Sequence, residues 1–208
     1  MRTHTKETQM SLTPEKALEI LKEGNQRFMN NLKANRNLLQ QVNDTSTGQF
    51  PFATILSCID SRTSAELIFD QGLGDVFSIR IAGNILNEDI LGSMEFATKI
   101  VGTKIIVVLG HTRCGAIVGA CNHVELGNLT TLLNKIQPAI FNEKETTENR
   151  NGSNAEFVNN VTNINVRLTI ERIRRESPII AELETNGQIK IIGGVYNVES
   201  GQVSFFED

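Results

Sequence analysis

Apolar residues along the chain gather in short unbroken runs that polar segments separate. Residues 52–56, 76–81 and 104–109 form three such runs, and the last of them, KIIVVL, is the most continuous. Runs of this length, rich in β-branched residues, are typical of strands buried on both faces of a sheet. Two further runs at 189–198 and 203–206 flank the turn residues Glu-Ser-Gly and predict a closing strand or hairpin.

Between these runs, apolar residues recur at helical spacing. A helix is predicted to start with Thr13 as its N-cap and Pro14 in its first turn. Further helices are expected over 90–100, over 114–121 and in a long segment that ends before Pro178. Alternating strands and helices predict an α/β fold with a central, mostly parallel sheet flanked by helices. An N-terminal helical arm and C-terminal strands complete the expected architecture.

The length of 208 residues favours a single domain over 1–208. Residues 1–10 are polar and are expected to be disordered, and 11–34 are expected to form the helical arm. The polar segments 35–48 and 142–155 are predicted to be loops, the second of them exposed.

Composition limits the cellular location and the classes of binding partner that can be expected for this chain. The net charge of −4 gives no reason to expect nucleic acid as a partner. No apolar run approaches the ~20 residues that cross a membrane, and the first residues lack the apolar stretch of a secretory signal. A cytoplasmic location is therefore expected. In that reducing compartment the three cysteines favour metal binding, catalysis or burial over disulfides.

Two motifs carry the candidate chemistry, and each follows a predicted strand. CIDSR supplies Cys58 and Asp60, and HTRC supplies His111 and Cys114. Each motif alone is weak, because a cysteine after a strand is usually structural. Together they offer thiolate, imidazole and carboxylate, the donors that zinc prefers. If the two strands are neighbours, their carboxyl ends bring these donors to one edge of the sheet. The sequence therefore predicts one Zn²⁺ per chain.

Asp60 has a second possible partner in Arg62. The two residues point to the same side of an extended stretch, and a guanidinium can bind a carboxylate with two parallel hydrogen bonds. Bound to zinc, Asp60 would close a four-ligand shell; paired with Arg62, it would leave the fourth position open for water, as a catalytic zinc requires. The pair is therefore interpreted as a dyad that opens or closes the zinc site. An ordinary salt bridge is the alternative.

These residues resemble the β-class carbonic anhydrase family of bacterial type, which carries C-x-D-S-R and H-x-x-C in this order and separation. The resemblance covers almost the whole chain. The similar segments are ALEILKEGNQRFMNN at 17–31, FDQGLGDVFSIRIAGN at 69–84, GSMEFATKIVGTKIIVVLGHTRCGA at 92–116 and IIGGVYNVESGQV at 191–203.

The resemblance implies a β-carbonic anhydrase-like fold and a homodimer or homotetramer, with the N-terminal helix reaching a partner. It implies that the chain catalyses the reversible hydration of carbon dioxide to bicarbonate and a proton by zinc-bound hydroxide. The residues that match the family's site fall into three groups: the zinc ligands Cys58, His111 and Cys114; the dyad Asp60 and Arg62; and the substrate-binding residues Gln71, Phe96 and Gly115.

Three other functions compete with this one. A hydrolase of carbon disulfide or carbonyl sulfide would use the same metal site, and a non-enzymatic protein would keep its zinc permanently closed. The Asp60–Arg62 pair argues against the closed site, because a structural zinc needs no release partner. Nucleotide binding by LGHTRCGA fails, because no Lys-Ser or Lys-Thr pair follows its glycines.

Overall fold

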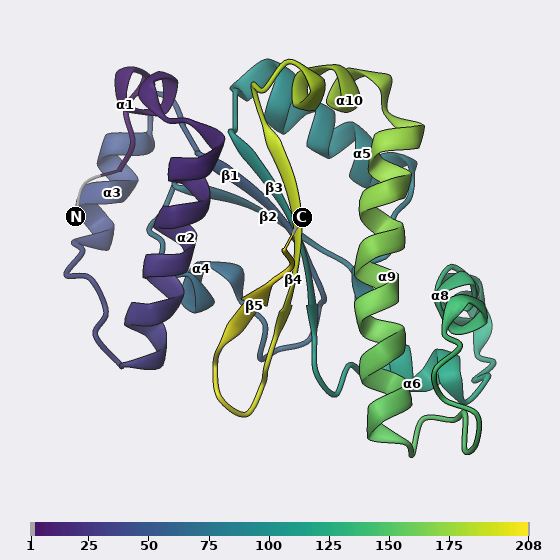
Figure 1. The fold of residues 1–208 in the computed structure, drawn as a ribbon. Coiled ribbons are helices and arrows are strands. Elements are labelled where there is room, and N and C mark those ends of the chain that lie inside the picture. Colours follow the sequence, from purple (N-terminus) through teal and green to yellow (C-terminus); the bar gives the residue numbers. More distant parts are fainter. Residues whose placement is uncertain (1–2, 208) are drawn as a thin grey trace.

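The computed structural model describes residues 3–207, which contain a five-stranded sheet in the spatial order β2-β1-β3-β4-β5 (Figure 1). The first four strands run parallel, and β5 pairs antiparallel with β4. The predicted α/β class with a mostly parallel sheet is confirmed. The strands are β1 (Ala53–Ser57), β2 (Val76–Arg80), β3 (Ile105–His111), β4 (Lys190–Tyr196) and β5 (Val203–Phe205).

In the described part of the chain, three helices precede β1, and further helices lie in the connections from β1 to β4. None of those in residues 3–207 is long and apolar enough to cross a membrane. The helices are α1 (Lys6–Ser11), α2 (Pro14–Met29), α3 (Leu38–Thr45), α4 (Ala65–Ile68), η1 (Ala82–Asn84), α5 (Glu88–Glu95), η2 (Phe96–Val101), α6 (Gly115–Cys121), α7 (Gly127–Asn134), α8 (Gln137–Asn142), α9 (Ala155–Glu176) and α10 (Pro178–Thr185).

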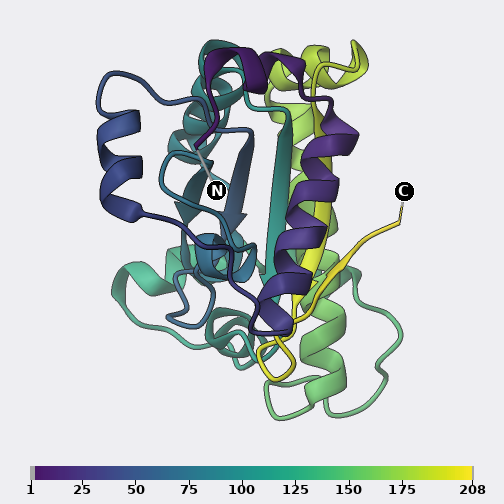
Figure 2. The same ribbon diagram turned by 90° about the vertical axis from the view of Figure 1, so that its left-hand side faces the viewer.

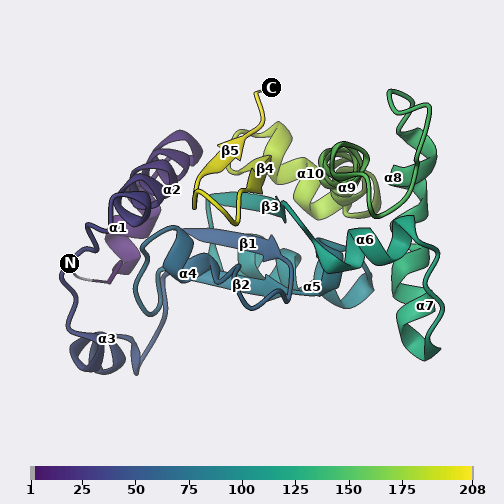
Figure 3. The same ribbon diagram turned by 90° about the horizontal axis from the view of Figure 1, so that it is seen from below.

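The sheet lies between two layers of helices, which Figures 1 and 3 show from two directions. Helix α2 covers one face, where Leu21 belongs to the same buried cluster as Val107 of β3. Helices α5, α9 and α10 cover the other face, where Val108 shares a cluster with Ile173. Successive residues of β3 thus enter opposite cores, and all seven residues of the strand are buried. This explains why the run KIIVVL shows no alternation with polar residues.

The expectation of disorder over 1–10 is wrong for the part that the structure describes, since α1 begins at Lys6; the first two residues lie outside the described range. Thr5 caps this helix with its side chain. The buried Gln9 amide then donates to the carbonyl oxygens of Pro51 at 2.6 Å and Val101 at 3.1 Å. These two tertiary bonds hold the helix on the body of the protein, and the local sequence does not reveal them.

Helix α2 starts as predicted, with Thr13 as N-cap and Pro14 in the first turn. The prediction of a loop over 35–48 is wrong, because α3 occupies its middle with Asn37 as N-cap. Figure 2 shows α3 standing away from the sheet. Its buried Gln41 accepts a hydrogen bond from the main chain of the loop that precedes β2. The helix is therefore anchored by a polar side chain, while its apolar residues Leu38, Leu39 and Val42 are exposed.

The polar segment 142–155 was expected to be an exposed loop, yet Glu143 is fully buried. Its carboxylate accepts hydrogen bonds from the main chain of Thr146 and from the guanidinium of Arg150. The Arg150 guanidinium also lies 4.7 Å from the ring centre of Phe157. A buried ion pair thus organises this segment, and its composition alone gave no sign of it.

The run 76–81 was expected to be a buried strand, but β2 lies at the edge of the sheet. Its apolar side chains are half-buried, while Ser78 and Arg80 are exposed. An apolar run does not reveal whether a strand is central or at an edge, because strand order is a tertiary property.

We expect Gly24→Ala to destabilise the fold by about 2 kcal/mol or more, because helix α2 would have to move off its support. A Cβ at Gly24 would lie only 1.8 Å from the carbonyl oxygen of Phe69. Gly92→Ala in α5 is the matched control, since a Cβ there meets nothing within 4 Å. That variant should be neutral or gain up to ~1 kcal/mol of helix propensity. Urea unfolding measures both, and equal midpoints would contradict the close contact at Gly24.

Candidate metal centre

Two neighbouring strands deliver the cysteine and histidine side chains to one edge of the sheet. Cys58 follows β1 directly, His111 is the last residue of β3, and Cys114 is the N-cap of α6. Strands β1 and β3 pair in parallel, so their carboxyl ends meet. All three residues are buried, and their potential ligand atoms lie within 4.8 Å of one another. The predicted convergence of these three residues is therefore present in the structure.

The two thiols of this group affect each other's ionisation. The Cys58 and Cys114 Sγ atoms lie 4.0 Å apart, and the main-chain N–H of Gly83 donates to the Cys58 sulfur at 3.3 Å. Hydrogen bonding from Cys114 lowers the pKa of Cys58, with a smaller contribution from the main-chain N–H of Gly83. The same contact, together with burial, raises the pKa of Cys114. The pair therefore favours one thiolate, the form of cysteine that binds metals.

His111 presents one ring nitrogen to the group. Its Nδ1 lies 2.9 Å from the carbonyl oxygen of Thr112. A carbonyl can only accept, so Nδ1 carries the proton and Nε2 is left with its lone pair. Nε2 is buried and has no hydrogen-bond partner among the described residues. A buried nitrogen without a partner is costly, and a metal ion would satisfy it. The residues present thus fit a metal ion that takes sulfur and nitrogen donors.

Asp60 is paired with Arg62 and lies outside this group of three. Its carboxylate accepts two hydrogen bonds from the Arg62 guanidinium, at 2.9 and 2.8 Å, and a third from the Arg62 main chain at 3.0 Å. The guanidinium holds the pKa of Asp60 well below its usual range. Half of the Arg62 side chain is exposed, so this pair lies at the rim of the buried group.

The residues expected to bind substrate lie in different places. Gly115 opens α6 next to Cys114, and a Cβ there would meet nothing within 4 Å. The Gln71 amide donates to the carbonyl oxygen of Phe69 at 2.6 Å and lies against α2. Phe96 is half exposed and contacts Phe77 of the edge strand, with ring centres 6.4 Å apart. Gly115 is therefore next to the group, whereas the contacts of Gln71 and Phe96 are with other parts of the chain.

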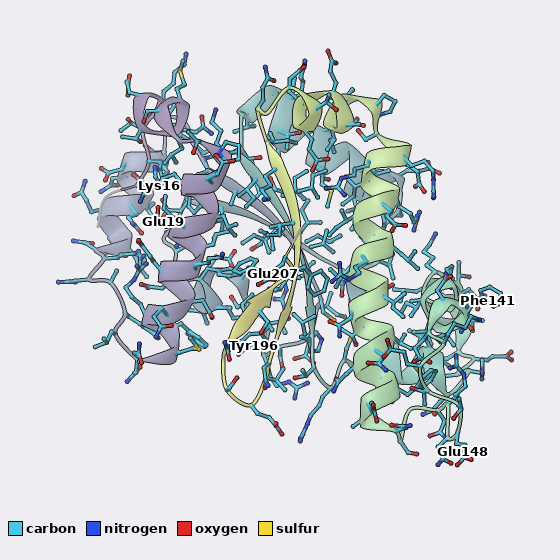
Figure 4. The ribbon with its side chains drawn as sticks, viewed as in Figure 1. Lys16, Glu19, Phe141, Glu148, Tyr196 and Glu207 are labelled. Atoms are coloured by element: carbon cyan, nitrogen blue, oxygen red, sulfur yellow. The ribbon has the colours of Figure 1, made fainter. Side chains whose placement is uncertain are left out.

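Two residues near the group were not singled out from the sequence. Tyr196 is in register with His111 and is buried, and Figure 4 labels it on β4 near the hairpin that leads to β5. Burial raises its pKa, while the charge of Arg62 acts in the opposite direction. Arg80 ends β2 and donates to the main chain of the CIDSR segment. Both residues come close to the group because of how their strands are aligned with β1 and β3, and this alignment cannot be read from a single sequence.

Comparison with known proteins gives relatives along most of the chain. A profile of the carbonic anhydrase family matches residues 53–203. Carbonic anhydrase 2 of Mycobacterium tuberculosis is 33% identical over 197 residues, which cover 91% of each chain. The carbonic anhydrase of Mycolicibacterium smegmatis is 30% identical over 197 residues, covering 91% of this chain and 92% of its own.

Solved structures agree with the observed fold. The β-carbonic anhydrase CcaA superposes with a TM-score of 0.71 at 25% identity, covering 91% of this chain and 95% of its own. One of two tetrameric β-carbonic anhydrases from Sordaria macrospora gives a TM-score of 0.71 at 23% identity, covering 81% and 90%. The profile match and the mycobacterial relatives, taken with this fold, show that the chain belongs to the β-carbonic anhydrase family of enzymes.

Proposed function

We propose that the chain binds one Zn²⁺ through Cys58, His111 and Cys114 and catalyses the reversible hydration of carbon dioxide to bicarbonate and a proton. The observation that carries this proposal is the convergence of these three ligand atoms within 4.8 Å of one another. Zinc suits a set of two cysteine sulfurs and one histidine nitrogen. Three protein ligands leave a fourth position, where zinc would lower the pKa of a bound water toward ~7.

In this proposal the Asp60–Arg62 dyad controls access to the fourth position. The two hydrogen bonds from Arg62 keep the carboxylate ionised and paired with the guanidinium, outside the group of three ligands. An ionised carboxylate there can accept a hydrogen bond from water and orient it toward the substrate. If Asp60 exchanged Arg62 for the metal, it would fill the position that water needs.

Substrate would approach beside Gly115, where the absence of a side chain leaves open space next to Cys114. The substrate roles of Gln71 and Phe96 stay predictions. Gln71 would have to release the Phe69 carbonyl oxygen to contact a substrate. Phe96 would have to act from the outer surface of the protein, where half of it is exposed.

We also propose that the chain assembles into a homodimer or homotetramer. A relative from Sordaria macrospora with the same fold is tetrameric. Several large apolar side chains are more than half exposed on this chain, among them Leu39 and Ile100. Burial in a second copy would remove such surface from water.

Cys58→Ser and His111→Ala should each lower zinc affinity by more than ~100-fold and abolish carbon dioxide hydration, because each removes a direct ligand. Zinc content after gel filtration and stopped-flow hydration measure the two effects. Cys121→Ala is the matched control, since Cys121 is a buried core cysteine whose pKa is raised by burial to about 11. Activity that persists without bound metal would overturn the proposed site, and hydrolysis of carbon disulfide without hydration of carbon dioxide would overturn the proposed substrate.

Arg62→Ala should keep one zinc ion per chain and lower turnover by about tenfold or more at neutral pH, since Asp60 loses the partner that keeps it off the metal. Arg175→Ala provides the control, because Arg175 is an exposed arginine whose ion pair among residues 3–207 is with the neighbouring Glu176. Metal analysis and stopped-flow hydration are run on the same samples. Wild-type turnover in Arg62→Ala would remove the dyad from the mechanism.

A further inference from the structure

The main chain on either side of Asp60 is held by a residue from the neighbouring strand. Arg80 ends β2, where it is in register with Ser57. Its Nε donates to the carbonyl oxygen of Cys58 at 3.0 Å, and its NH2 donates to the carbonyl oxygen of Asp60 at 2.7 Å. One rigid guanidinium thus fixes the distance between two peptide groups of the CIDSR segment.

Thr63 donates to the same two carbonyl oxygens. Its hydroxyl lies 3.1 Å from the Cys58 oxygen and 2.9 Å from the Asp60 oxygen, and its main-chain N–H donates to the Asp60 oxygen at 3.0 Å. The Asp60 oxygen therefore has three donors around it, one of them charged. Because a carbonyl oxygen has two lone pairs, this carbonyl is fully occupied and its peptide plane is fixed.

That plane also positions the main-chain N–H of Arg62 relative to the Asp60 side chain. With the carbonyl fixed, the carboxylate accepts from the Arg62 main chain and from the Arg62 guanidinium together. Movement of the carboxylate toward Cys58 and His111 would break all three of these bonds. The donors on the carbonyl oxygens hold the turn in the conformation that keeps the Arg62 main-chain N–H within reach of the carboxylate.

Arg80 makes these contacts without being held by an acid. Among the described residues, no carboxylate lies within ion-pair distance of Arg80. Arg80 is exposed to solvent, and its guanidinium donates to two carbonyl oxygens that both belong to this turn. The charge of Arg80 is thus directed at the turn that carries Asp60.

We infer that Arg80 is a positioning residue, which holds the turn at Cys58–Asp60 so that Asp60 stays on Arg62 and the fourth metal position stays open. This inference rests on the proposed zinc site and dyad. It adds a residue from a different strand, and it places the control of the open state in main-chain geometry as well as in the carboxylate. Loss of Arg80 should increase the fraction of molecules in which Asp60 occupies the fourth position.

Arg80→Gln tests the inference, because glutamine cannot bridge the two carbonyl oxygens as the guanidinium does. The protein is loaded with Co²⁺, and azide is titrated while the visible absorption of the metal is followed. Azide binds only where the fourth position is open, so its apparent Kd should rise by about tenfold if the open fraction falls by that factor. Metal content should stay at one ion per chain, and turnover of the zinc form should fall in parallel.

Two further variants serve as controls. Arg80→Lys keeps the charge but places all of its donors on a single nitrogen, so it should restore azide affinity in part. Arg175→Gln removes an exposed arginine far along the sequence and should match the wild type. Unchanged azide affinity in Arg80→Gln, together with weakened affinity in Arg62→Ala, would overturn the role of Arg80 and leave the proposed function standing. Failure of wild-type protein to bind Co²⁺ at the cysteines would instead overturn the proposed function.

If Arg80→Gln does not retain metal, Thr63→Val decides the question, because it removes a donor to the same two carbonyl oxygens and keeps the shape of the side chain. Weaker azide binding in Thr63→Val, with rescue by Thr63→Ser, supports the fixed turn. Azide affinity equal to that of the wild type in Thr63→Val overturns it.

Discussion

The separation of two adjacent parallel strands sets the geometry of the metal centre. Neighbouring strands lie about 4.8 Å apart, which is close to the spacing needed by side chains that share one ion. Strands β1 and β3 are neighbours and both end at the same edge, so Cys58 meets His111 and Cys114 within 4.8 Å. Both faces of β3 are buried under helices, and this burial keeps the strand pair from shifting.

Burial raises the free-energy cost of leaving the polar atoms of these three side chains without partners. The sulfur atoms of Cys58 and Cys114 lie only 4.0 Å apart, and the Nε2 atom of His111 has no hydrogen-bond partner among the described residues. Buried polar atoms of this kind cost free energy unless something satisfies them. A metal ion would satisfy all three at once, and its binding would then stabilise this edge of the sheet.

The rim of the centre has a different character from its interior. The ligand side chains are almost fully buried, whereas half of the Arg62 side chain is exposed and Asp60 keeps some access to water. A carboxylate at such a boundary can exchange one cationic partner for another at modest cost, because solvent can replace the contacts it loses. In the proposed function, the buried ligands would provide rigidity, and the partly exposed Asp60–Arg62 pair would provide the freedom that a switch requires. We infer that Arg80 and Thr63 limit that freedom through their hydrogen bonds to the main chain.

The sequence by itself determined the α/β class, the strands β1, β3 and β4 and the start of α2. It also identified the cysteine and histidine side chains that converge, Cys58, His111 and Cys114, and the neighbouring pair Asp60 and Arg62. These features depend on local periodicity and on which side chain stands at each position, and both are written in the chain. The tertiary structure alone decided the edge position of β2, the anchoring of α1 and α3, the burial of Glu143, and the approach of Tyr196 and Arg80 to the centre. Each of these depends on a contact between residues far apart in sequence, which forms only when the strand order brings them together.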